Sequence, residues 1–134
     1  MSSILVDSNV LIDAMAPASD WYDWSVKTLK YHADHYRLLI NPIIYAEVSI
    51  RFASIEDADV ALPQAMFTRE PLPYEAAFLA GKAFVSYRRR GGVKISPLPD
   101  FYIGAHAAIA GYQIMTRDPT RYRTYFPKLK LISP

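Results

Sequence analysis

The sequence predicts an α/β protein with a mainly parallel sheet of about four to five strands flanked by helices. Two observations predict this fold class. Short, wholly apolar runs alternate along the chain with longer segments of helical periodicity. Asparagine, proline and glycine, which begin or end helices, stand at the junctions between these segments. No repeat, low-complexity tract or linker interrupts the 134 residues, so we predict a single domain spanning residues 1–134.

The first half of the chain is predicted to alternate two strands with helices. In chain order these elements are a strand at 4–6, a helix beginning at 8, a helix over 20–35, a strand at 38–40, and helices over 42–52 and 55–66. Both strand runs, ILV and LLI, are apolar without alternation, as in parallel strands that are covered on both faces. Asn41 followed by Pro42 combines a favourable N-cap with proline in the first helical turn, which indicates where the third helix begins.

The second half continues the same alternation. In chain order its elements are a helix over 73–90, a helix from 99 to 110, a strand at 113–116 and a strand at 129–132. The pair Gly91-Gly92 is expected to end the first of these helices, and Gly111 the second.

Composition excludes several classes of site. The chain has no cysteine, which rules out disulfides, thiolate metal sites and a cysteine nucleophile. The N-terminus lacks the basic and apolar stretches of a signal peptide, and no apolar run approaches the roughly 18 residues that a membrane span needs. We therefore expect a soluble cytoplasmic protein that does not bind a membrane.

Charge is distributed unevenly along the chain. Residues 1–66 carry nine acids and four bases, whereas residues 67–134 carry four acids and eleven bases. This division predicts one basic face suited to a polyanionic partner. The alternative is that the charges intermix once the chain folds.

Three acids follow or face the ends of predicted strands. Asp7 follows the first strand, Asp118 follows the third, and Asp100 opens a helix in the loop layer at the same end. Ligands of α/β proteins bind at the carboxyl ends of the strands, so the three are expected to meet there. Each also has a separate explanation: Asp7 as an N-cap, Asp100 as a charge favoured by the helix dipole, and Asp118 as a turn residue.

Glu47 is the fourth candidate acid. At 100° per residue from Ile43, Glu47 lies at about 40° and Ile50 at about 340°, which places the carboxylate within an apolar helix face. A carboxylate there is costly unless it is paired or bound to a metal, and an ion pair with Arg51 is the alternative. Four carboxylates without cysteine or a suitable histidine pair favour Mg²⁺ or Mn²⁺, which activates water and stabilises phosphoryl charge.

Four segments of the chain, in order, resemble the motifs of PIN domains. They are ILVDSNVLI at 4–12, NPIIYAE at 41–47, DFYIGAHA at 100–107 and IMTRD at 114–118, with YFP and LKLI completing the pattern near the C-terminus. The compact length resembles that of VapC-like toxins in particular. The resemblance implies a PIN-like fold, an acidic Mg²⁺ or Mn²⁺ pocket, an RNA substrate, homodimers and a cognate antitoxin.

By position, the resemblance implies a metal-binding and catalytic quartet and an auxiliary set of pocket residues. The quartet is Asp7, Glu47, Asp100 and Asp118, and the auxiliary residues are Ser8, Asn9 and Thr116. Given an RNA substrate, the basic side chains Arg88, Arg89, Arg90 and Arg117 are possible RNA contacts. Ser8 stands where many relatives have threonine and keeps the hydroxyl. For the three consecutive arginines, the alternative is a solvated helix end favoured by the dipole.

Two other polar residues receive structural interpretations. His106 lies about 240° around its helix from Asp100, so a structural or surface role is expected. Asp13, one turn after Asn9, is expected at the surface, with the pocket edge as the alternative.

The sequence therefore predicts a Mg²⁺- or Mn²⁺-dependent ribonuclease that is the toxin of a toxin–antitoxin pair. One alternative is an RNA-processing nuclease of the same fold outside a toxin system, and another is a catalytically silent RNA-binding module. A phosphatase or dehalogenase with Asp7 as its nucleophile is a third, but no Asp-x-Asp pair follows the first strand and no lysine lies near the third-strand motif.

Overall fold

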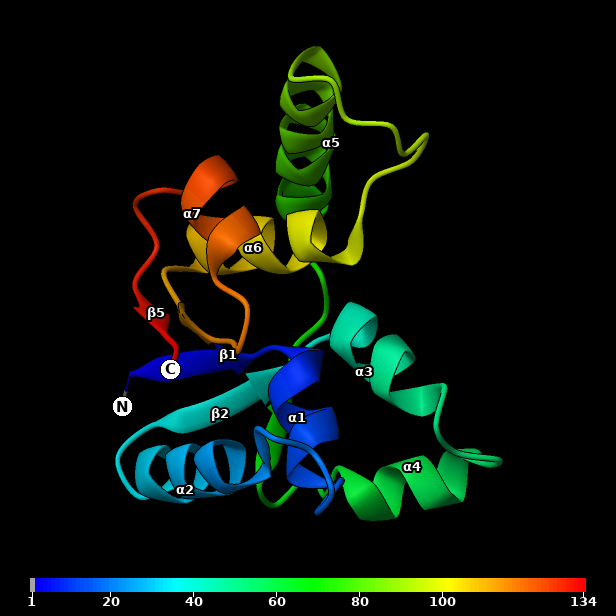
Figure 1. Cartoon of the computed structure of the whole chain (residues 1–134), viewed down its shortest axis with the longest axis vertical. Helices are drawn as coiled ribbons and strands as arrows, with labels where there is room; N and C mark the ends of the chain where they lie inside the picture. Colours follow the sequence, from blue (N-terminus) through cyan, green and yellow to red (C-terminus); the bar gives the residue numbers. More distant parts are fainter. Residues whose placement is uncertain (1) are drawn as a thin grey trace.

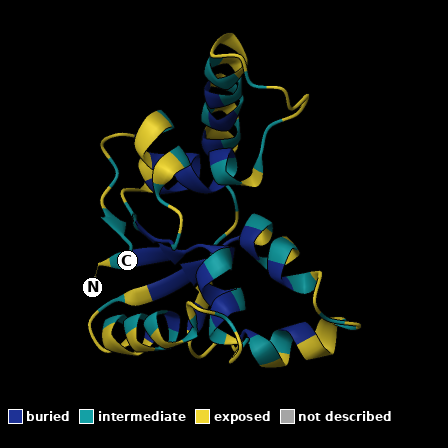
Figure 2. Cartoon of the chain, in the orientation of Figure 1, coloured by how far each residue is buried: buried dark blue, intermediate teal, exposed yellow. Residues whose placement is uncertain are grey.

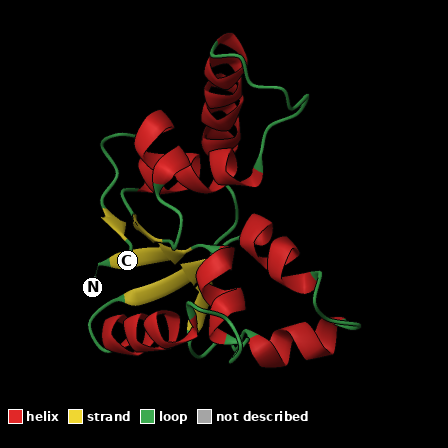
Figure 3. Cartoon of the chain, viewed as in Figure 1, coloured by secondary structure: helices red, strands yellow, loops and turns green. Residues whose placement is uncertain are grey.

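A parallel sheet lies between two groups of helices in the computed structural model, which describes residues 2–134 (Figures 1 and 3). The strands are β1 (Ser3–Val6), β2 (Arg37–Ile40), β3 (Phe67–Arg69), β4 (Gln113–Met115) and β5 (Leu131–Ile132). Their order is β3-β2-β1-β4-β5, and every neighbouring pair is parallel. The predicted α/β class and parallel sheet are confirmed.

Helices cover both faces of this sheet. They are α1 (Ser8–Ala14), α2 (Tyr22–Ala33), α3 (Pro42–Ser49), α4 (Ile55–Ala61), α5 (Tyr74–Arg89), α6 (Pro99–Ala110) and α7 (Thr120–Tyr125). Figure 1 shows α6 and α7 on one side of the sheet and α1 and α2 on the other, with α5 extending away from it. None of the helices between residues 2 and 134 is long and apolar enough to cross a membrane.

The predicted helix starts and stops match the structure at three places. The Asn41 side chain accepts a hydrogen bond from the Ile44 backbone N–H at 2.9 Å, so it caps α3 as expected. Gly91 and Gly111 have φ angles of 90° and 78°, the left-handed conformation that glycine adopts after a helix.

The segment 55–66 is not one helix, as predicted, but a shorter helix followed by a strand. The helix α4 ends at Ala61 because Leu62 precedes Pro63, and a residue before proline disfavours the α conformation. Leu62 accordingly has φ −121° and ψ 67°. The chain then enters the edge strand β3, which the sequence did not predict. The helix predicted over 20–35 is also shorter, because α2 begins at Tyr22 and Asp20 does not cap it.

The centre of the sheet is apolar. Ile4, Leu5 and Val6 of β1 are fully buried, and Figure 2 shows the central strands in the colour of buried residues. Because β1 lies between β2 and β4, the chain leaves it in one direction to reach β2 and returns on its other side as β4. Such a reversal of strand order opens a crevice at the carboxyl end of the central strand, and Asp7 stands there.

Gly104 of α6 permits the close approach of Phe126, which follows α7. A Cβ at Gly104 would lie 2.5 Å from two carbons of the Phe126 ring, which is buried. We expect Gly104→Ala to lower the free energy of unfolding, since overpacking costs about 1–3 kcal/mol and helix propensity returns only about 1 kcal/mol. The matched control is Gly81→Ala in α5, where nothing lies within 4 Å of the added Cβ. Urea denaturation should show Gly81→Ala stabilised; an equal gain for Gly104→Ala would contradict the packing.

Candidate active site at the carboxyl end of the sheet

Asp7 is buried at the end of β1, with 3% of its surface exposed. Its backbone occupies the N-cap position of α1, but its side chain makes no capping hydrogen bond. The carboxylate instead accepts two short hydrogen bonds at Oδ2, from the Thr116 hydroxyl at 2.9 Å and from the Tyr122 hydroxyl at 2.8 Å. Two long ones of 3.5 Å come from Asn9 Nδ2 at Oδ2 and from the Ser8 hydroxyl at Oδ1. Asn9 supports this arrangement, because its Nδ2 donates to Thr116 Oγ1 at 3.2 Å.

The environment of Asp7 disfavours its negative charge. Burial, the largest cause, and the nearby charges of Asp100 and Glu47 together raise the pKa of Asp7 from 3.8 to about 6, against the lowering effect of the hydrogen bonds from Tyr122 and Thr116. Burial also holds the pKa of Tyr122 well above its usual value, so the phenol stays protonated and donates. The ionised form of Asp7 is thus destabilised, and a cation beside it would stabilise it.

Glu47 reaches the site from α3 and is half-buried. The Ser8 hydroxyl donates to its Oε1 at 2.8 Å, and burial followed by the charge of Asp100 raises the pKa of Glu47 despite that bond. The predicted apolar face is present in part, because Ile44 is fully buried and Ile43 packs against the core, whereas Ile50, which follows α3, is 85% exposed. The alternative ion pair with Arg51 is not formed among residues 2–134, since α3 ends at Ser49 and Arg51 lies outside its regular turns.

Asp100 enters from the first turn of α6, directly after Pro99. Its side chain makes no capping hydrogen bond and instead accepts one from Arg121 Nη1 at 3.3 Å. Burial raises the pKa of Asp100, Arg121 opposes the rise, and the charge of Asp118 adds to it.

Asp118 is the exposed member of the set. Its backbone N–H donates to Thr116 Oγ1 at 3.1 Å, which fixes the loop after β4 beside Asp7. The carboxylate is close enough to Asp100 to raise the pKa of that residue. The four predicted acids therefore form one electrostatically connected cluster.

This cluster fits a hard divalent cation by its chemistry. All four donors are carboxylates, and those with raised pKa values would be stabilised by a nearby cation. Within residues 2–134, however, no three such groups converge closely enough to hold an ion as they stand. Ser8 donates to Oε1 of Glu47 and Arg121 to Oδ2 of Asp100, so each of these carboxylates has its other oxygen available to a cation.

Sequence reasoning missed the contribution of α7. This helix brings the buried Tyr122 to Asp7 and Arg121 to Asp100. Its sequence, TRYRTY, is rich in β-branched and aromatic residues with modest helix propensity, so it gave no helical signal. The alternation of arginine and tyrosine directly after the fourth acid was the available clue.

Asp13 was also misjudged. It is 7% exposed rather than at the surface, and its Oδ2 accepts a hydrogen bond from Arg117 Nε at 2.6 Å. Arg117 therefore lies at the edge of the acidic cluster, next to Asp118.

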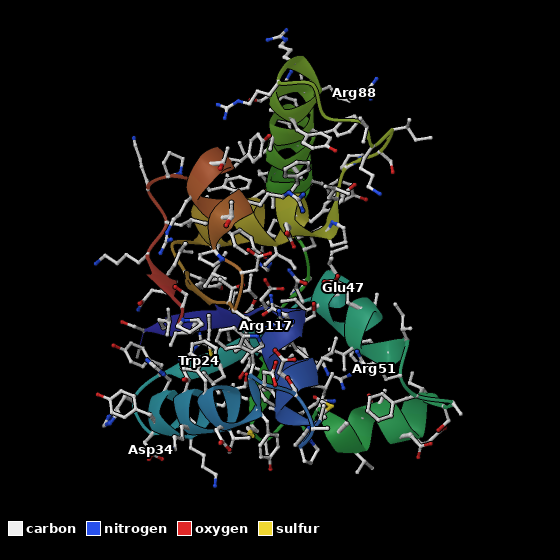
Figure 4. All side chains as sticks on the ribbon, in the orientation of Figure 1. Trp24, Asp34, Glu47, Arg51, Arg88 and Arg117 are labelled. Carbon is white, nitrogen blue, oxygen red and sulfur yellow. The ribbon has the colours of Figure 1, made fainter. Side chains whose placement is uncertain are left out.

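Of the other three predicted RNA contacts, Arg88 lies away from this cluster. Figure 4 shows Arg88 at the distal end of α5, away from Glu47 and Arg117. Arg88 Nη1 donates to the backbone carbonyls of Gly92 at 3.0 Å and Lys94 at 3.1 Å. Arg90 lies over the Tyr125 ring of α7, 5.2 Å from its centroid. None of residues 88–90 forms an ion pair with the four acids among residues 2–134.

His106 has the structural role that was expected. It is buried, and its Nδ1 lies 3.1 Å from Nδ2 of Asn41, the residue that caps α3. The interaction ties α6 to the start of the helix that carries Glu47.

Comparison with solved structures supports the fold. The chain is 17% identical to a chain of VapBC2 from Rickettsia felis, solved bound to a DNA fragment from its promoter, with a TM-score of 0.74 over 98% of each chain. It is 16% identical to a chain of VapBC-1 from nontypeable Haemophilus influenzae, with a TM-score of 0.73 over 98% of this chain and 97% of that one. For VapC20 of Mycobacterium tuberculosis, described as a sarcin-ricin loop cleaving toxin, the identity is 13% and the TM-score 0.64, covering 90% of this chain and 94% of that one.

Sequence comparison assigns the family. A search of curated proteins returns no significant match. The family model of the PIN domain matches residues 4–127, which include all four acids and the helix α7. The chain therefore belongs to the PIN domain family.

Proposed function

We propose that this protein is a Mg²⁺- or Mn²⁺-dependent ribonuclease that acts in the cytoplasm as the toxin of a toxin–antitoxin pair. The observation that carries the proposal is the position of Asp7, which is buried where the strand order of the sheet reverses. The charges of Glu47 and Asp100 are close enough to raise the pKa of Asp7. Membership of the PIN domain family and the likeness to a toxin described as cleaving the sarcin-ricin loop support it.

The residues of the site have two kinds of proposed role, holding the cation and orienting the carboxylates that hold it. Asp7, Glu47, Asp100 and Asp118 would hold the cation, which when bound supplies charge neutralisation at the phosphate and acidifies water. Tyr122 and Thr116 fix the direction of the Asp7 carboxylate through Oδ2. Ser8 does the same for Glu47.

Space for a substrate lies beside Glu47. An open depression of about 590 Å³ is lined by Ile12, Glu47, Ile50 and Arg51. We propose that it admits the RNA backbone, because its one carboxylate belongs to the acidic cluster and Arg51 offers a phosphate a positive charge.

An antitoxin is the proposed partner at α3 and α4. Solved structures similar to this chain include a toxin–antitoxin complex from Klebsiella pneumoniae, 20% identical, with a TM-score of 0.64 over 89% of each chain. Ile50, Ile55 and Val60, on and between these helices, are exposed large apolar side chains, and Ile50 lines the depression beside Glu47. Exposed apolar side chains that gather in one region mark interaction surfaces, and an antitoxin segment there would also block the depression.

A second copy of the chain is the proposed partner of α5. Tyr74, Phe78 and Val85 recur at helical spacing on this helix, and all three are exposed. Such an apolar face suits the homodimer that the resemblance implies.

The catalytic proposal is tested with purified protein and a structured RNA. We expect cleavage in Mg²⁺ or Mn²⁺, none in excess EDTA, and recovery when Mn²⁺ is added back. Single-stranded DNA of the same sequence and a small phosphate ester are run in parallel. Cleavage that persists in verified excess chelator would contradict the metal requirement, and turnover of the phosphate ester without cleavage of RNA would favour a phosphatase with Asp7 as nucleophile.

The toxin proposal is tested in growing bacteria. Induced expression of the wild-type chain should arrest growth, and Asp7→Asn at the same protein level should relieve the arrest. Equal arrest by both versions would separate toxicity from the acidic site and contradict the proposal.

A further inference from the structure

Arg117 is held at the edge of the acidic cluster by two hydrogen bonds. Its backbone N–H donates to Asn9 Oδ1 at 3.0 Å, and its Nε donates to Asp13 Oδ2 at 2.6 Å. Asp13 is itself buried and anchored, because the Ser19 hydroxyl donates to its Oδ1 at 3.1 Å. The side chain of Arg117 is therefore fixed at its Nε edge by a carboxylate that is also held in place.

The two Nη groups of the Arg117 guanidinium are available for a ligand. Neither Nη of Arg117 has a hydrogen-bond partner among residues 2–134, and the side chain is 35% exposed. Arginine paired with a carboxylate commonly forms two parallel hydrogen bonds, whereas here Asp13 takes Nε alone. The remaining N–H groups keep the planar geometry that matches a phosphate.

Two arginines near the site differ from Arg117 in this respect. Arg121 points its Nη1 at Asp100, and Arg51, beside Glu47, has no ion pair among residues 2–134 that fixes its orientation. Arg88, far from the acids, points its Nη1 at backbone carbonyls. Arg117 thus combines closeness to Asp118, a fixed orientation and a free donor edge.

We propose that Arg117 binds a phosphate of the RNA backbone through its Nη edge, and that Asp13 and Ser19 are positioning residues that hold it in that orientation. The inference rests on the proposed ribonuclease function. Its physical basis is that a phosphodiester entering a cluster of carboxylates is repelled, and a fixed cation beside Asp118 offsets that repulsion. Fixing the guanidinium beforehand avoids the entropy lost in ordering it on binding.

A purely structural role makes a different prediction. If the Asp13–Arg117 pair served only to join α1 to the loop after β4, its loss would lower the melting temperature and leave RNA binding and turnover unchanged. The experiment therefore measures binding, turnover and stability together.

Binding of a short single-stranded RNA of mixed sequence is measured in EDTA over a range of KCl concentrations, and kcat and KM in Mg²⁺. We expect Arg117→Ala to weaken binding about tenfold, and the slope of log K against log salt to fall by about 0.7. Arg117→Lys should keep the slope but lower kcat, since lysine lacks the planar fork. Asp13→Ala should keep the slope, lower kcat by about tenfold and have no further effect in the Arg117→Ala background.

The matched control is the Asp59–Arg69 ion pair, which is equally short at 2.7 Å and lies outside the acidic cluster. Asp59→Ala and Arg69→Ala should leave kcat unchanged. Should Asp13→Ala fail to fold, Asp13→Asn removes the charge while keeping an oxygen acceptor, and it should lower kcat in the same direction by a smaller factor.

The outcomes separate this inference from the proposed function. Two results would overturn the inference alone. One is that Arg117→Ala leaves RNA binding unchanged. The other is that the losses of kcat in Asp13→Ala and Arg117→Ala multiply in the double variant. Wild-type protein that binds RNA through Arg117 without cleaving it would overturn the nuclease function alone. Absence of both binding and cleavage in the wild type would overturn both.

Discussion

Asparagine in place of Asp7 should reduce RNA cleavage about a thousandfold and, without metal, should make the protein more stable. The loss of activity follows because Asp7 is the most buried of the four carboxylates and a cation at a phosphoryl centre contributes several kcal/mol. The shape of the site is retained, since the two short hydrogen bonds to Asp7 end on Oδ2, where the asparagine carbonyl oxygen can accept them. The bond at Oδ1, from the Ser8 hydroxyl, is long at 3.5 Å. Asp20→Asn, at an exposed position, is the control and should cleave as the wild type does.

The gain in stability has a defined pH dependence. A rise in the pKa of Asp7 from 3.8 to about 6 corresponds to roughly 3 kcal/mol. Because the folded state binds this proton more tightly than the unfolded state, the contribution of Asp7 to stability is greatest below pH 3.8 and is lost as pH rises to about 6. The variant should therefore match the wild type near pH 4 and exceed it by up to about 3 kcal/mol above pH 6.

Urea denaturation in EDTA across that pH range measures the difference. A variant less stable than the wild type at every pH would show that Asp7 is a structural acceptor rather than a destabilising charge.

Removing the Tyr122 hydroxyl should produce the second large effect. Tyr122→Phe deletes a 2.8 Å hydrogen bond to the buried carboxylate of Asp7. We expect the free energy of unfolding to fall by about 1.5–3 kcal/mol at neutral pH, the range for hydrogen bonds to charged groups. Cleavage should fall by about 10- to 100-fold, as when a residue that orients a metal ligand is lost.

The matched control is Tyr125→Phe on the same helix, because the Tyr125 hydroxyl has no hydrogen-bond partner among residues 2–134. In the Asp7→Asn background the cost of Tyr122→Phe should drop to about 0.5–1.5 kcal/mol, since the acceptor is then neutral. Equal losses in Tyr122→Phe and Tyr125→Phe would assign the effect to packing.

Most of the fold could be predicted because its signals are local. The apolar run before Asp7, the cap at Asn41 and the glycines at 91 and 111 each act within a few residues, and each lies where expected. The two missed elements lack such signals. The strand β3 is short and follows a helix that Pro63 ends early, and α7 consists of residues that do not favour helices by themselves.

The acids of the site were accessible to sequence reasoning, whereas their partners were not. Strand ends and helix starts locate Asp7 and Asp100 at one edge of a parallel sheet. Tyr122 is 115 residues from Asp7, and Arg117 is 104 residues from Asp13, so only the folded chain relates them. The apolar face used to select Glu47 is buried only in part, since Ile44 is buried and Ile50 is exposed, and the contact of Glu47 with Ser8 could not be predicted.

Direct measurement of Mn²⁺ binding tests the central claim, that the four acids form a cation site. Mn²⁺ is titrated into the wild type, Asp7→Asn and Asp100→Asn while electron paramagnetic resonance follows the free ion, and each sample is checked for folding by circular dichroism. We expect the wild type to take up Mn²⁺ with saturable stoichiometry and both variants to bind it at least about tenfold more weakly. Uptake that is the same in all three proteins, or absent from the folded wild type, would contradict the claim.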